Sequence, residues 1–183
     1  MRFPAVLLLT GLVLTGSPIA WGRGFEAEAG SQRIDSRYCT LLLDSGVDIG
    51  KINRKVSVRG VHRLKLPKGS SPETELAAKC DILFERAEEI LDMFPPGIHV
   101  TLQIMANRDS IRDVHELQYG HATDAVSIYL FENNTIYSLA KEVSESVLIH
   151  EMAHCILDHF FQVRPPSKVE ELLAMHVDAQ MRE

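Results

Sequence analysis

The segment from Glu142 to Phe161 carries apolar residues around most of a helix circumference. A helix on the surface of a globular protein has a wider polar face, so we expect this helix to lie mostly buried. Buried polar groups are costly unless they are paired or bound to a metal ion. The polar residues of the segment form one narrow stripe, with Glu145 and Glu151 beside it: Glu142, Ser146, His150, His154 and Asp158.

His150, Glu151 and His154 spell the motif H-E-x-x-H within this helix. Four residues advance a helix by slightly more than one turn, so both imidazoles lie on one face and can bind one ion. Zinc favours imidazole nitrogen in a tetrahedral shell, and catalytic sites leave one position to water. The motif predicts a Zn²⁺ site with His150 and His154 as ligands and Glu151 as the catalytic residue that deprotonates the water. A pair of hydrogen-bonded core histidines is the alternative interpretation.

A third ligand is expected from the segment that follows. Pro165 and Pro166 end the first helix because proline cannot continue one. Ser167 is predicted to cap the next helix, with Glu170 reaching back in a capping box, which leaves Glu171 free to face the metal. Asp178, two turns further, lies on the same helix face as Glu171 and is a candidate acceptor for a ligating imidazole, or a solvated carboxylate. Other candidates for the third ligand are Glu170, His176 and His159.

The motif, a short loop and the stretch 169–174 together resemble the gluzincin pattern of MA-type peptidases and minigluzincins. In that family the second helix often carries a glutamate with an alanine three residues on, here Glu171 and Ala174. The resemblance implies that His150, His154 and Glu171 bind zinc and that Glu151 is the general base. It implies a zincin-like α+β fold, in which a small mixed or antiparallel sheet packs on a long helix, the motif helix and a C-terminal helix that bears the glutamate.

The amino terminus predicts export. A positive residue, an apolar run from Phe3 to Leu14 and small residues after it are typical of a signal peptide, here residues 1–20. The run is shorter than a membrane-spanning helix, so no stable membrane anchor is expected. We predict a flexible lead-in over residues 21–34, one metallopeptidase domain over 35–183, and a secreted or periplasmic location.

The composition is that of an ordinary globular protein, with 45% hydrophobic and 24% charged residues and a net charge of −6. An acidic chain argues against a nucleic-acid partner, so the expected partner is a peptide or protein substrate. A non-catalytic or latent zinc-binding domain is the alternative function. An oxidising compartment permits a disulfide, most naturally Cys39–Cys80, whereas the alternative is that Cys39, Cys80 and Cys155 are simply buried.

The remaining elements follow from apolar periodicity and from turn residues. Ile52–Leu66 gives only a hint of an extended piece. Asn133 and Asn134 predict a tight hairpin turn. The first strand of that hairpin could bind substrate backbone at a sheet edge, and Tyr129 or Tyr137 could stabilise an oxyanion, although a plain structural hairpin is the alternative. The expected elements are strands at Arg37–Leu43, His99–Met105, Ala125–Phe131 and Thr135–Leu139, and helices at Glu73–Phe94 and Arg108–Leu117.

Overall fold

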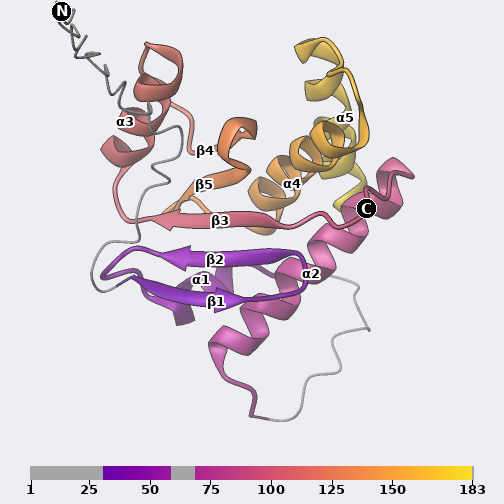
Figure 1. Ribbon diagram of the computed structural model, residues 1–183. Helices are drawn as coiled ribbons and strands as arrows, with labels where there is room; N and C mark the ends of the chain where they lie inside the picture. Colours follow the sequence, from indigo (N-terminus) through magenta and orange to yellow (C-terminus); the bar gives the residue numbers. More distant parts are fainter. Residues whose placement is uncertain (1–30, 59–68, 183) are drawn as a thin grey trace, which may run out of the picture.

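The computed structural model describes residues 31–58 and 69–182, within which five strands form one mixed sheet in the order β1-β2-β3-β5-β4 (Figure 1). The three inner strands are parallel, and each edge strand is antiparallel to its neighbour. The expected α+β class is confirmed. The strands are β1 (Gln32–Asp35), β2 (Cys39–Leu43), β3 (Val100–Met105), β4 (Ser127–Leu130) and β5 (Thr135–Leu139).

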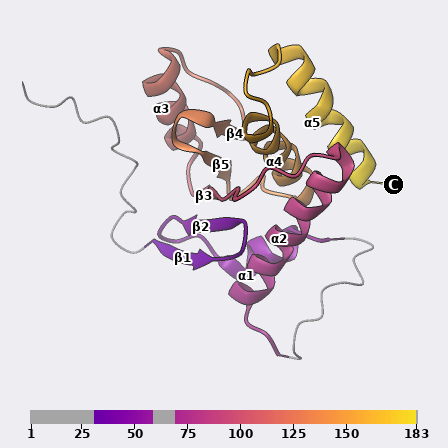
Figure 2. The same ribbon diagram turned by 45° about the vertical axis from the view of Figure 1, so that its right-hand side comes forward.

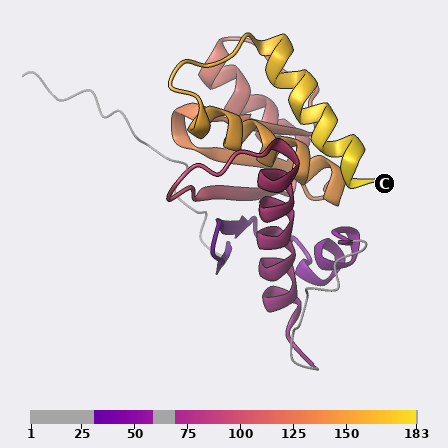
Figure 3. The same cartoon turned by 90° about the vertical axis from the view of Figure 1, so that its right-hand side faces the viewer.

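Helices cover both faces of this sheet. The long helix α2 and the motif helix α4 cross on one face, and α5 lies outside α4 (Figure 3). The bounds are α1 (Ile49–Lys55), α2 (Pro72–Leu91), α3 (Arg108–Tyr119), α4 (Glu145–Phe160) and α5 (Ser167–Met181), with a short 3₁₀ turn at Phe131–Asn133.

The alternation of side chains along the strands separates two clusters of buried residues. Leu102 and Ile104 of β3 and Ile136 of β5 face α2 and α4 in the main core. The neighbouring positions Tyr137 and Leu139 point to the opposite face, where they pack with Ile111 and Val114 of α3. Figure 2 shows α3 beside β5, away from α2. Strand β5 is buried on both faces, which is typical of an inner strand.

The strands and helices expected over 37–43, 73–94, 99–105 and 108–117 are confirmed with shifted ends. One expectation was wrong. Residues 32–34, assigned to the lead-in, belong to β1, which pairs with β2. The start of the ambiguous segment, at Ile52, lies in helix α1, which the Asp48 side chain caps by accepting a hydrogen bond from the Lys51 backbone N–H. The signal peptide at 1–20 and residues 59–66 of the ambiguous segment lie outside the described residues.

The predicted hairpin is confirmed, since β4 and β5 pair antiparallel, but its connection spans residues 131–134 with a 3₁₀ turn rather than a tight turn at Asn133 and Asn134. Asn134 adopts the left-handed conformation, with φ 52°. Its side-chain amide donates to the His99 carbonyl at 2.6 Å, which ties the turn to the residue before β3. Asparagine tolerates this backbone conformation better than most residues do.

All three cysteines are buried free thiols, so the structure takes the alternative to a Cys39–Cys80 disulfide. None of the helices within the described ranges is both long and apolar enough to span a bilayer.

Candidate metal centre

The site is built on two antiparallel helices, α4 and α5. The Ser144 hydroxyl caps α4 by accepting from the Val147 backbone N–H. The start of α5 differs from the prediction, because Pro166 occupies the N-cap position and no side chain caps the helix there. Glu170 therefore makes no capping box with Ser167, and its carboxylate contacts Arg164 instead.

His150, His154 and Glu171 converge as predicted. The Nε2 atoms of the two imidazoles lie 3.3 Å apart. The carboxylate oxygens of Glu171 lie 3.6 Å from His150 Nε2 and 3.5 Å from His154 Nε2. Three ligand atoms within 4.8 Å of one another could hold a metal ion.

The small side chain of Ala174 accompanies this close approach. Ala174 follows Glu171 by about one helical turn and is completely buried, as is Val177. At the other end of the helix pair, the Ser146 hydroxyl of α4 donates to Asp178 of α5. The two helices are therefore in contact through the buried residues of α5 near Glu171 and again at the Ser146–Asp178 hydrogen bond.

The site opens toward solvent on the Glu171 side. The exposed side-chain fractions are 14% for His154, 27% for His150 and 58% for Glu171. Burial, and then the neighbouring charge of His150, lowers the pKa of His154 to about 4. The His154 imidazole is therefore neutral near pH 7, which is the form that binds metals.

Glu151 lies deeper in the fold, in contact with the edge strand. Burial raises the pKa of the Glu151 carboxyl to about 7, while the Ser127 hydroxyl and the Tyr129 backbone N–H beside it oppose that rise. The Ser127 hydroxyl itself donates to the Tyr137 carbonyl at 3.1 Å. Ser127 faces the same side of the sheet as its register partner Ser138. The Ser138 hydroxyl is buried and has no hydrogen-bond partner. Two serines thus make a polar patch beneath the motif helix, on a sheet face that is otherwise apolar.

Strand β4 is an outer strand of the sheet. The Val126 carbonyl accepts from the Leu139 backbone N–H, so residues 128 and 130 also direct their backbone groups to β5. Ser127 and Tyr129 then direct theirs away from the sheet. The motif helix packs beside this strand.

The other candidate ligands lie elsewhere. Glu170 is buried and contacts Arg164, 3.3 Å away. His159 Nδ1 lies 2.9 Å from the carbonyl of Cys155 on its own helix. His176 is exposed on α5 and does not belong to the converging group.

Three further residues singled out from the sequence have other partners. Asp178 contacts Ser146 and Arg182, rather than a ligating imidazole. The Tyr129 hydroxyl donates to Asp158 and Asn134, both at 3.2 Å. The Tyr137 hydroxyl accepts from Asn133 at 2.8 Å. Neither tyrosine is thus placed as an oxyanion donor in this arrangement.

Ser127 and Arg164 were missed by the sequence reasoning. Ser127 sits in a short apolar strand, where a serine facing the core is a weak signal. Arg164 precedes two prolines and resembles any loop arginine. Only the folded structure brings it between Asp158 and Glu170.

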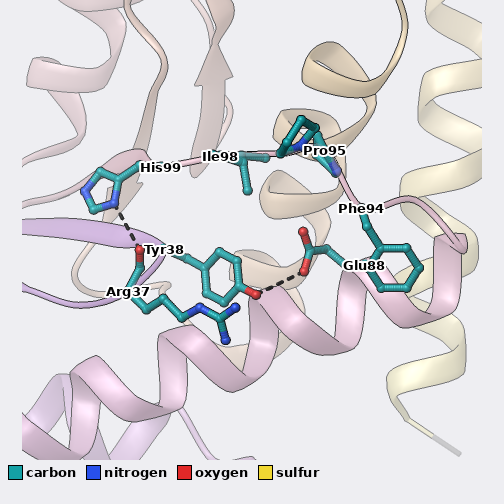
Figure 4. Close-up of a pocket in the computed structure, with 9 residues that line it drawn as sticks. Arg37, Tyr38, Glu88, Phe94, Pro95, Ile98 and His99 are labelled. Carbon is teal, nitrogen blue, oxygen red and sulfur yellow. Dashed lines mark hydrogen bonds between the residues drawn. The ribbon is translucent and has the colours of Figure 1, made fainter.

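A separate pocket of about 510 Å³ lies near the starts of β2 and β3 (Figure 4). Its buried carboxylate, Glu88, accepts from the Tyr38 hydroxyl at 3.2 Å, and Phe94 is exposed at the rim. The lining contains none of the three converging residues.

Comparisons with protein-family models, with curated proteins and with solved structures give no match for this chain. The function therefore has to be argued from the site itself.

Proposed function

We propose that this protein is a zinc-dependent peptidase whose metal ligands are His150, His154 and Glu171. The observation that carries the proposal is the spacing of the three ligand atoms. Zinc holds nitrogen and oxygen ligands at about 2.0–2.1 Å in a tetrahedral shell, which separates neighbouring ligand atoms by roughly 3.4 Å. The two Nε2 atoms lie 3.3 Å apart, and each has its own carboxylate oxygen of Glu171 nearby, Oε1 at 3.5 Å from His154 and Oε2 at 3.6 Å from His150. With one atom counted per residue, all three ligand atoms lie within 4.8 Å of one another. Imidazole and carboxylate are also a donor set that suits zinc.

A three-ligand set leaves one tetrahedral position for water, as in catalytic zinc sites. When bound, zinc lowers the pKa of such a water toward 7 and polarises the carbonyl to be attacked. The Glu151 carboxylate would accept the proton from the water and pass it to the amide nitrogen of the leaving group. A pKa of about 7 in the metal-free protein suits a group that both accepts and donates a proton near neutrality.

A peptide substrate is supported by the outer strand β4. The backbone groups of Ser127 and the Tyr129 carbonyl point away from the sheet, as does the Tyr129 N–H, which lies beside the Glu151 carboxyl. An extended peptide can pair with such an edge through main-chain hydrogen bonds. The predicted signal peptide indicates that the protein is exported, so we propose that this reaction takes place outside the cytoplasm.

A non-catalytic zinc-binding domain is the second candidate. The observation in its favour is that Tyr129 and Tyr137, the two residues considered for oxyanion stabilisation, are both engaged with other side chains. Such a protein would use the metal for stability and would present the edge strand only for binding.

The test combines metal content with cleavage. We expect about one zinc per purified wild-type chain and a marked loss in Glu171→Ala. Cleavage of casein should require zinc, stop with a chelator and return when zinc is restored. Glu151→Gln should keep zinc and lose cleavage. Zinc binding without cleavage would favour the second candidate, whereas a folded wild-type protein that takes up no zinc would overturn both.

A further inference from the structure

Arg164 lies in the loop between α4 and α5 and contacts three elements around the site. Its Nε atom is 3.3 Å from Asp158 on α4 and 3.3 Å from Glu170 on α5. The guanidinium carbon lies 4.2 Å from the centre of the Phe131 ring, which follows β4. Asp158 in turn accepts from the Tyr129 hydroxyl of β4 at 3.2 Å.

The two carboxylates beside Arg164 are largely buried. The exposed side-chain fractions are 17% for Asp158 and 10% for Glu170, against 40% for Arg164. A buried carboxylate without a partner is strongly destabilising, so the arginine stabilises both acids, although Asp158 also accepts from the Tyr129 hydroxyl. The arginine suits this place because its charge persists at every relevant pH and its planar group stacks on aromatic rings.

Glu170 and Glu171 are consecutive residues of α5. Holding the Glu170 backbone in place therefore also fixes the backbone position of Glu171. Glu171 itself is mostly exposed and cannot be held by packing. The start of α5 also lacks a side-chain cap. The contact between Glu170 and Arg164 is therefore the anchor that stands closest to Glu171.

We infer that Arg164 is the positioning residue of this site, because it holds Glu170 against the end of α4 and thereby sets Glu171 opposite the two histidines. The inference rests on the proposed metal site. Arg164 touches neither the ligand atoms nor, in this role, the substrate. It acts by fixing where α5 lies along α4.

Arg182 provides a matched control at the far end of the same helix pair. Its guanidinium contacts Asp178 of α5 and donates to Ser146 of α4 at 3.0 Å. Both arginines therefore link α4 to α5, Arg164 through a carboxylate on each helix and Arg182 through Asp178 on α5 and the Ser146 hydroxyl on α4, but only Arg164 does so beside Glu171. A loss of general helix packing would affect both variants alike.

The experiment measures zinc affinity by competition with a chromophoric chelator, on full chains, for wild type, Arg164→Gln and Arg182→Gln. The thermal midpoint of each metal-free protein is recorded alongside. Removing a group that orients a ligand typically weakens metal binding 10–100-fold. We expect a loss of about that size for R164Q and less than about threefold for R182Q. The visible absorption of the Co²⁺ forms should change only in R164Q.

A double variant, Arg164→Gln with Glu170→Gln, separates position from stability. It removes the Glu170 charge that R164Q leaves beside no arginine, while Asp158 keeps the Tyr129 hydroxyl, so its thermal midpoint should rise above that of R164Q. Zinc affinity should stay weak because α5 is still not anchored. Recovery of affinity together with stability would overturn the inference, as would an R164Q protein with unchanged affinity. If R164Q does not fold, Arg164→Lys and the double variant carry the comparison. A wild-type protein that binds no zinc would instead refute the metal site itself.

Discussion

The carboxylate of Glu171 lies 3.5 Å from the imidazole of His154, although the two residues come from different helices separated by a proline-containing loop. This distance depends on how closely α5 can approach α4. Ala174 is completely buried one turn beyond Glu171, where a larger side chain would force the helices apart.

We expect Ala174→Leu to lower the free energy of unfolding by about 1–3 kcal/mol, the usual range for overpacking a core position. Zinc binding should weaken at the same time, because Glu171 moves away from both histidines. Chemical denaturation and zinc titration check the two effects. Ala179→Leu, on the exposed side of α5, is the control and should change neither. Tight zinc binding in Ala174→Leu would contradict this view of the helix contact.

The buried carboxyl of Glu151 should make the metal-free protein less stable as the pH rises. Its pKa is about 7 in the fold against 4.5 for an ordinary glutamate, so the folded state holds a proton that the unfolded state releases. The stabilising effect of that proton is complete below about pH 4.5 and is lost as the pH rises through 7. This change in pKa corresponds to a decrease in the free energy of unfolding on the order of 3 kcal/mol between low and high pH.

Glu151→Gln removes this titration while nearly preserving the shape of the side chain. With chelator present, we expect the variant to unfold at higher urea than wild type at pH 8 and at a similar concentration at pH 4.5. Glu142→Gln, an exposed position on the same chain segment, should follow wild type at both pH values. An equal response of E151Q and wild type to pH would show that the Glu151 carboxyl is not buried.

The three cysteines should be unreactive in the folded protein. Burial raises the pKa of Cys80 and of Cys155 to about 12, and that of Cys39 also rises well above its usual value. Because the thiolate is the reactive form, a thiol reagent should label all three residues only after denaturant is added. Counting labelled thiols by mass spectrometry checks this. Fewer than three labelled residues after unfolding under non-reducing conditions would point to a disulfide instead.

Asn134 adopts a left-handed backbone conformation and also makes side-chain hydrogen bonds. Two substitutions separate these contributions. Asn134→Gly keeps the left-handed turn but loses the bonds to His99 and Tyr129, whereas Asn134→Ala also strains the backbone. We expect both to destabilise the protein, the alanine variant by about 1 kcal/mol more than the glycine variant. Urea midpoints give the comparison. Equal midpoints would mean that the turn conformation contributes little.

The sequence was sufficient for the features that depend on local pattern. The motif and the helical spacing predicted the facing of His150 and His154, and the resemblance to gluzincins suggested Glu171 as their partner. The hairpin followed from Asn133 and Asn134. In each case the determining residues lie close together in the chain, so periodicity or turn chemistry carries the information.

The features that escaped prediction depend on contacts made outside their own helix or strand. The capping box at Ser167 was wrong because Pro166 takes the N-cap position and Glu170 contacts Arg164 in the loop instead. Strand β1 was missed because its four residues alternate weakly and only pairing with β2 makes them a strand. The same holds for the contact between Glu151 and Ser127, which joins a helix to a strand across the core.

The short connection between α4 and α5 has a consequence for how the molecule assembles. Closing a loop of a few residues loses little chain entropy, whereas pairing Cys39 with Val100 brings together segments that are remote in the sequence. Helices α4 and α5 thus pack through contacts that are local in the sequence, whereas the sheet depends on long-range pairing such as that of β2 with β3. We expect the formation of the sheet to limit the folding rate. Stopped-flow refolding would then be slowed more by a conservative truncation such as Leu41→Ala in β2 than by Val177→Ala in α5.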